Sequence, residues 1–97
     1  SYYSDYPYLS FNACQYIVSK GIRLLGMDVP SPDNPKDDYA SGNDSPNHKY
    51  LFSNGMILVE YLTNLNKITV KEFCISVMPL PIRGGDGSPA RVIAYWG

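Results

Sequence analysis

The sequence predicts an α/β fold in which helices pack on a mixed β-sheet. Hydrophobic residues make up 44% and charged residues 18% of the 97 residues, as in ordinary globular proteins. Nearly continuous apolar runs of strand length alternate with stretches of helical pattern along the first two thirds of the chain. Two further strand candidates follow in succession. The resulting order, α-β-α-β-β-β, favours a mixed sheet with helices on it and a single domain over residues 1–97.

The first helix is expected at residues 11–20, because Ser10 can accept a hydrogen bond from the free amides of a first turn. Its inward face is expected to comprise Ala13, Ile17 and Cys14. Gly21 suits a left-handed residue at the end of the helix. The apolar run at residues 22–28 then predicts a buried strand.

A long loop and a second helix–strand unit come next. Residues 29–46 contain Pro30, Pro32, Pro35 and Pro46 and form a loop longer than is usual in compact domains, which is typical of functional or mobile segments. A short helix is expected at 47–54, with Tyr50 or Leu51 facing inward, followed by a left-handed Gly55. Residues 56–62 are apolar enough for a central strand.

The last third of the chain predicts two more strands. Residues 63–68 suit a turn or a single helical turn, and residues 72–79 form a strand that Pro79 ends. A glycine-rich connection at 83–89 leads to the final strand at 90–96.

Composition excludes several classes of function. The net charge of −1 gives no electrostatic basis for binding nucleic acid or an anionic membrane. The longest apolar stretch, 56–59, is far shorter than a membrane span, so we expect a cytoplasmic protein. Cys14 and Cys74 show no Cys-x-x-Cys spacing and predict two buried free thiols rather than a zinc ribbon or a disulfide framework.

Glu60 is the most informative single residue. It lies inside an apolar run, where an unpaired carboxylate is very costly, so it needs a metal ion, an arginine or backbone amides as its partner. His48, the sole histidine, precedes it on the short helix, and a tight turn can bring the two side chains together as metal ligands. In the alternative interpretation Glu60 pairs with Arg91, for instance, and His48 is a surface residue.

Two other chemistries are not supported. The stretch Gly84-Gly85-Asp86-Gly87 lacks the lysine and the strand-loop-helix context of a phosphate-binding loop. No Gly-x-Ser-x-Gly elbow is present, and only one histidine is available as a base for a serine nucleophile.

Short motifs follow one another along nearly the whole chain. In order they are Leu9-Ser10-x-x-Ala13, the stretch 21–31 ending in Gly26-x-Asp28-x-x-Ser31, His48, residues 55–60, residues 62–65, and Gly84-x-x-Gly87-Ser88-Pro89-x-Arg91. Their order and spacing resemble the cyclase family of metal-dependent hydrolases, which includes kynurenine formamidase (arylformamidase) and isatin hydrolase. The resemblance is to the C-terminal part of that fold.

The resemblance implies a metal-dependent hydrolase of an amide or lactam C–N bond. His48 and Glu60 would be ligands of Zn²⁺ or Mn²⁺, joining an earlier His-x-x-x-His-x-Asp cluster that this chain lacks. Asp28 and Ser31 would orient ligands or line the substrate pocket, although turn formation and capping also explain them. Tyr61 stands where relatives often have Asn.

The same resemblance sets expectations about partners. This chain alone would be inactive and would need the missing N-terminal half or a companion chain; homo-oligomers and a small-molecule amide substrate are expected as well. The remaining alternative is a non-catalytic interaction or binding domain that keeps the hydrolase fold and uses the acidic loop 33–44 as its contact surface.

Overall fold

The protein is described here by a computed structural model, which covers residues 5–36 and 45–97. The chain divides into two compact units, Ser1–Thr63 and Asn64–Gly97. We call them the first and second unit.

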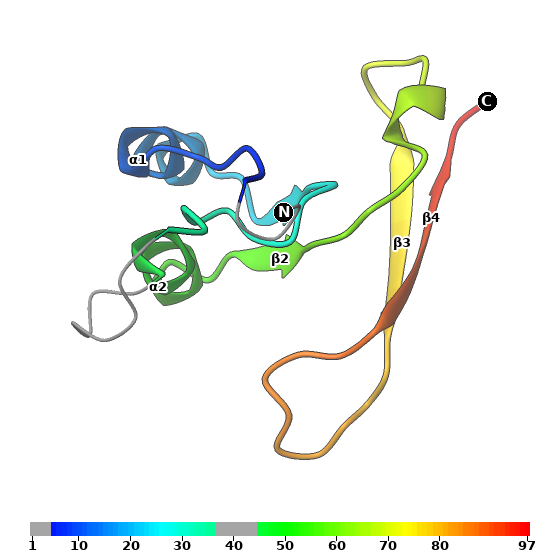
Figure 1. Cartoon of the computed structure of the whole chain (residues 1–97). Helices are drawn as coiled ribbons and strands as arrows, with labels where there is room; N and C mark the ends of the chain where they lie inside the picture. The colour runs from blue at the N-terminus through cyan, green and yellow to red at the C-terminus, as the bar shows by residue number, and fades with distance from the viewer. Residues whose placement is uncertain (1–4, 37–44) are drawn as a thin grey trace. The chain divides into compact units, whose positions relative to one another are not determined.

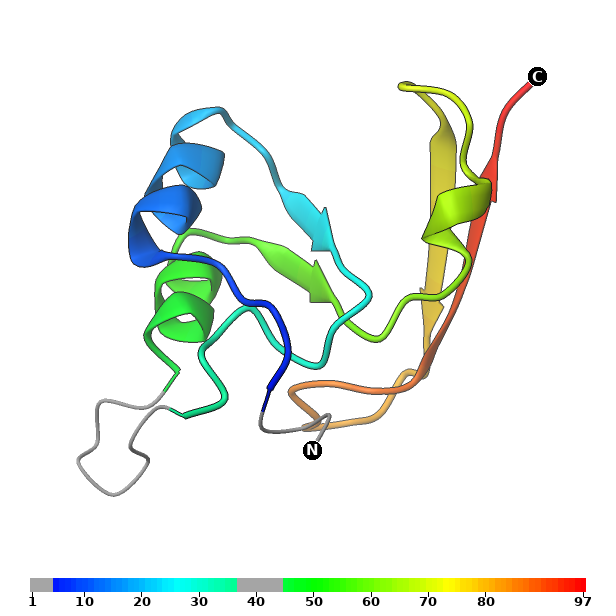
Figure 2. The ribbon, with the colours of Figure 1, turned by 45° about the horizontal axis from the view of Figure 1, so that its top comes forward.

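The first unit contains two helix–strand pairs (Figures 1 and 2). In chain order its elements are α1 (Phe11–Ser19), β1 (Leu24–Gly26), α2 (Pro46–Ser53) and β2 (Ile57–Val59). The strands β1 and β2 run parallel, with Leu25 opposite Leu58. The two helices pack side by side. The long loop between β1 and α2 therefore starts at the carboxyl end of β1, next to the point where β2 ends.

Local chemistry explains where the helices begin and end. Ser10 Oγ accepts a hydrogen bond from the Ala13 amide at 3.1 Å and so caps α1, as the sequence predicts. Gly21 follows α1 with a φ of 74°, and Gly55 follows α2 with a φ of 76°. Both values lie in the left-handed region that glycine adopts without steric cost. The two predicted helices are thus confirmed to within a residue or two at their ends.

The core of the first unit lies between the helices and the small parallel sheet. Cys14 and Leu51 are fully buried and Met56 is 4% exposed. The partly buried side chains packed against these three belong to Leu9, Ile17, Val18, Leu25, Tyr50 and Leu58. Of the two predicted inward candidates on α2, Leu51 is buried completely and Tyr50 only in part.

The strands are shorter than the apolar runs predict. Residues 56–62 were expected to form one strand, but β2 ends at Val59, and Tyr61 has a φ of 58°. A left-handed residue breaks an extended ladder. Two backbone hydrogen bonds nevertheless continue the pairing across this bend, from Tyr61 N–H to Val29 O at 3.1 Å and from Leu62 N–H to Met27 O at 2.9 Å.

The second unit is a two-stranded antiparallel ribbon. Its elements are the single turn η3 (Leu65–Lys67), β3 (Cys74–Pro79) and β4 (Ala90–Tyr95), with Val77 opposite Val92 (Figure 1). Most side chains of both strands are exposed. Cys74 is among them, so the prediction of two buried thiols is right for Cys14 and wrong for Cys74. The reason is that a two-stranded ribbon has no second layer of its own to cover either face.

The predicted α/β class is confirmed, with both parallel and antiparallel pairing. Among residues 5–36 and 45–97 the pairings occur in two separate two-stranded sheets, not in one continuous mixed sheet. None of the helices within these ranges is long and apolar enough to span a membrane.

Candidate functional site

His48 is held between two carboxylates. It lies in the first turn of α2, and its Nδ1 is 2.8 Å from Asp33 Oδ2, while its Nε2 is 2.9 Å from Glu60 Oε1. Ser31 Oγ is 3.5 Å from the same Nδ1, at the outer limit of a hydrogen bond. The ring is also packed beside Phe52, at a centroid distance of 5.6 Å. The orientation of the imidazole is therefore fixed from both of its nitrogens.

Asp33 reaches this position from the long loop and is buried, with 2% of its surface exposed. Its Oδ1 accepts from the backbone N–H of Asn47 at 2.6 Å, and its Oδ2 accepts from the backbone N–H of His48 at 2.9 Å. These are free amides of the first turn of α2, because Ser45 at the helix start makes no side-chain cap. A loop carboxylate thus caps α2 from fourteen residues away.

The loop around Asp33 is itself held in place. Ser31 Oγ accepts from the Asp33 amide at 3.0 Å, which closes a small turn. The Asn47 side chain, which is buried, donates to Leu9 O at 2.8 Å and to Pro32 O at 2.9 Å. These bonds join the segment before α1, the long loop and α2 at Asn47, the residue that precedes His48.

Glu60 comes directly after β2, on the far side of the ring from Asp33. Its side chain is 26% exposed, so it is less buried than its place in an apolar run suggested. The left-handed Tyr61 ends the extended run here and leaves the Glu60 carboxylate at its edge. The partner that the structure gives to Glu60 is His48, as expected from the tight connection through Gly55. This contact does not favour the alternative in which His48 is an unconnected surface residue.

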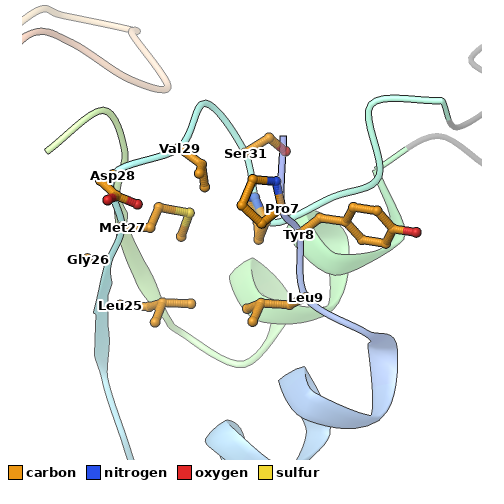
Figure 3. A pocket seen from close by; sticks show the side chains of 10 residues that line it. Pro7, Tyr8, Leu9, Leu25, Gly26, Met27, Asp28, Val29 and Ser31 are labelled. Carbon is orange, nitrogen blue, oxygen red and sulfur yellow. The ribbon is translucent and has the colours of Figure 1, made fainter. Parts of the chain in front are cut away.

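Asp28 and Ser31, the other two predicted site residues, line one pocket at the carboxyl end of β1 (Figure 3). The pocket has a volume of about 260 Å³ and is mostly apolar. Ser31 belongs both to this pocket and to the surroundings of His48, and it therefore connects the two.

The donor atoms fit part of a metal site but not all of it. Within the described ranges no group of three or more His, Cys, Asp and Glu side chains is placed to hold a metal ion. The reason is that Asp33 contacts one nitrogen of the His48 ring and Glu60 contacts the other, so the three side chains cannot all bind the same ion. His48 Nε2 and Glu60 Oε1, 2.9 Å apart, are close to the roughly 3.3 Å that separates two ligands of a tetrahedral zinc. Two ligands are present, and a third has to come from elsewhere.

Asp33 and Asn47 are the two residues of the candidate site that the sequence does not single out. Asp33 counted as one acidic residue of a proline-rich loop, and Asn47 as the start of a helix. Asp33 also acts on the Cys14 thiol in the core. Burial raises the pKa of this thiol, and the negative charge of Asp33 raises it further. Residues 37–44 of the acidic loop, which the interaction-domain alternative invokes, lie outside the described residues. Asp33 is turned inward and is not part of an exposed acidic surface.

Comparison with known proteins identifies relatives with one shared name. No protein-family model matches the chain. Kynurenine formamidases from Bacillus cereus (strain ATCC 14579) and Bacillus thuringiensis (strain Al Hakam) are 33% identical to it over 87 residues. The kynurenine formamidase of Bacillus anthracis is 32% identical over the same length. The aligned region is 90% of this chain but only 39% of each relative. The resemblance inferred from the motifs is thereby confirmed, and the chain is related by sequence to the kynurenine formamidases of the cyclase family.

Proposed function

We propose that this chain is part of a metal-dependent hydrolase that cleaves an amide or lactam C–N bond, with His48 and Glu60 as two ligands of a Zn²⁺ or Mn²⁺ ion. The observation that carries the proposal is the arrangement Asp33–His48–Glu60, in which one ring nitrogen binds a buried carboxylate and the other faces a more exposed one. Histidine ligands of metals commonly donate their second N–H to a carboxylate in this way.

The residues of this chain have separate tasks in that mechanism. When bound, the divalent ion supplies polarisation of the substrate carbonyl and a water of lowered pKa. His48 and Glu60 would hold the ion, with Nε2 of the one 2.9 Å from Oε1 of the other. Ser31 and Asp28 lie where a substrate in the adjoining pocket would be contacted. The single histidine is used as a ligand, so the group that transfers the proton to the leaving amine is expected in the rest of the protein.

The proposal includes a companion segment and an oligomer. A catalytic zinc keeps three protein ligands, and this chain offers two, so the His-x-x-x-His-x-Asp cluster is expected in the N-terminal part of the same protein or in a companion chain. The chain spans about two fifths of the length of its relatives, which is in line with this division. Apolar side chains such as Ile75, Met78 and Ile93 are exposed on the second unit, which suits association with a partner or a second copy.

An activity assay with a matched control tests the proposal. The natively purified protein is expected to hydrolyse an aryl formamide such as N-formylkynurenine. Glu60→Gln should lower kcat/KM by more than about 100-fold, because an amide is a much weaker metal ligand than a carboxylate. Glu72→Gln, an identical change at an exposed glutamate of the second unit, should leave it unchanged. Equal activity of the two variants would show that Glu60 takes no part in the reaction.

A further inference from the structure

We propose that Asp33 is a positioning residue for His48, holding the imidazole with a proton on Nδ1 so that Nε2 faces Glu60. This inference rests on the proposed function for its importance to metal binding. The geometry itself stands independently, in the 2.8 Å contact between Asp33 Oδ2 and His48 Nδ1 and the burial of the Asp33 carboxylate.

The bonding of Asp33 leaves little freedom for any other arrangement. Its two oxygens accept from the Asn47 amide, the His48 amide and the His48 ring. Both backbone amides are fixed by α2, so the carboxylate cannot rotate without leaving buried donors unpaired. An ionised carboxylate accepts hydrogen bonds and donates none, so the ring nitrogen that faces Asp33 carries a proton. The same rule places a proton on Nε2 while it bonds Glu60 directly, and a metal ion between Nε2 and Glu60 would take the place of that proton.

The contact also links the loop to the site. The same Oδ2 binds the backbone and the ring of His48, so the helix position and the ring orientation are set by one atom. Glu60 approaches from the other nitrogen. A ring turned by Asp33 in this way presents Nε2 to the side where the second ligand lies.

Alanine at position 33 is the informative substitution. Its methyl group accepts no hydrogen bond, so the His48 ring loses the acceptor that Asp33 supplies to Nδ1. Asparagine is less informative, because an amide oxygen in the place of Oδ2 could still accept from the His48 backbone amide and from Nδ1. With no acceptor at position 33, the Glu60 carboxylate at the other ring nitrogen favours a proton on Nε2.

Nitrogen-15 NMR reads the proton position of the His48 ring, and the signals that disappear in His48→Ala assign it among those of any other histidines in the natively purified protein. In the wild-type protein we expect an Nδ1–H signal that exchanges slowly with water. Asp33→Ala should abolish it, while the control Asp86→Ala, the same change at an exposed residue, should not. A wild-type His48 ring without an Nδ1–H, or an Asp33→Ala variant that keeps one with unchanged exchange, would overturn the proposal. The wild-type result alone decides if the variant does not fold.

Zinc binding to the natively purified protein is the second readout. With Zn²⁺ alone as the probe, Asp33→Ala should weaken binding about 10- to 100-fold. Unchanged affinity in a variant that has lost its Nδ1–H would overturn the positioning role. If His48→Ala leaves zinc affinity unchanged in an otherwise wild-type protein, the proposed function fails instead, and the NMR result still decides whether Asp33 fixes the ring.

Discussion

Replacing Asn47 with alanine should loosen the whole first unit, because its side chain joins three separate segments. The side-chain amide of Asn47 donates to Leu9 O at 2.8 Å and to Pro32 O at 2.9 Å, and the residue is 4% exposed. Each bond contributes about 1 kcal/mol. Pro32 O also accepts from the Leu9 amide and keeps a partner after the substitution, whereas the bond to Leu9 O is lost outright. We therefore expect Asn47→Ala to lower the free energy of unfolding of the first unit by about 2 kcal/mol.

The two cysteines provide the assay. Cys14 is buried in the first unit and reacts with a thiol reagent only when that unit opens, whereas Cys74 is exposed in the second unit and reacts at once. When reclosing is faster than labelling, the Cys14 rate follows the population of the open form. A loss of about 2 kcal/mol should raise that rate roughly 30-fold and leave the Cys74 phase unchanged.

Asn54→Ala is the matched control for this prediction. Asn54 lies at the other end of α2, is exposed, and donates to Tyr50 O at 2.9 Å. Its loss should change the Cys14 labelling rate by no more than about twofold. If Asn47→Ala also stays within twofold of the wild type, the reasoning that Asn47 ties the loop to α2 is wrong.

Two further predictions concern backbone strain and pH. Gly55→Ala should lower the free energy of unfolding, measured with urea, by about 1–2 kcal/mol, because a φ of 76° strains an alanine backbone. An added Cβ meets no atom at Gly55 or at Gly87, so Gly87→Ala is the control and should cost much less. Equal costs of the two substitutions would argue against backbone strain at Gly55. Burial raises the Cys14 pKa above its unfolded value, so the unfolded chain loses its proton first as pH rises. The free energy of unfolding should be at its full value below the ordinary thiol pKa and should fall as the pH rises from there toward the raised pKa of the folded state. If the free energy of unfolding of a Cys14→Ala variant falls just as steeply at alkaline pH, the Cys14 thiol is not the cause.

Much of the first unit follows from local sequence. Ser10 and Gly55 mark helix ends by chemistry that acts within a few residues, and the structure places the helices accordingly. The sequence correctly predicts that the His48 and Glu60 side chains meet, because a short helix and a short strand joined by a tight turn can pack in only a few ways. Patterns of this range are visible in a single sequence.

The support for the site depends on contacts between distant segments. Asp33 meets the start of α2 across the long loop, and no periodicity or motif distinguishes it from the other acidic residues of that loop. The end of β2 was missed for a related reason, since the left-handed backbone of Tyr61 follows from tertiary pairing with Val29 and not from the preference of a tyrosine. Cys74 is exposed because its ribbon has no covering layer, which hydrophobicity alone does not reveal.

Metal content and intact mass, measured together on the protein purified without denaturation, test the central claim most directly. The proposed function predicts about one Zn²⁺ or Mn²⁺ per active site, together with a polypeptide that supplies the remaining ligands, and it predicts that His48→Ala and Glu60→Ala each remove the metal. A wild-type protein that contains only this chain and no metal, or a metal retained fully in both variants, would contradict it.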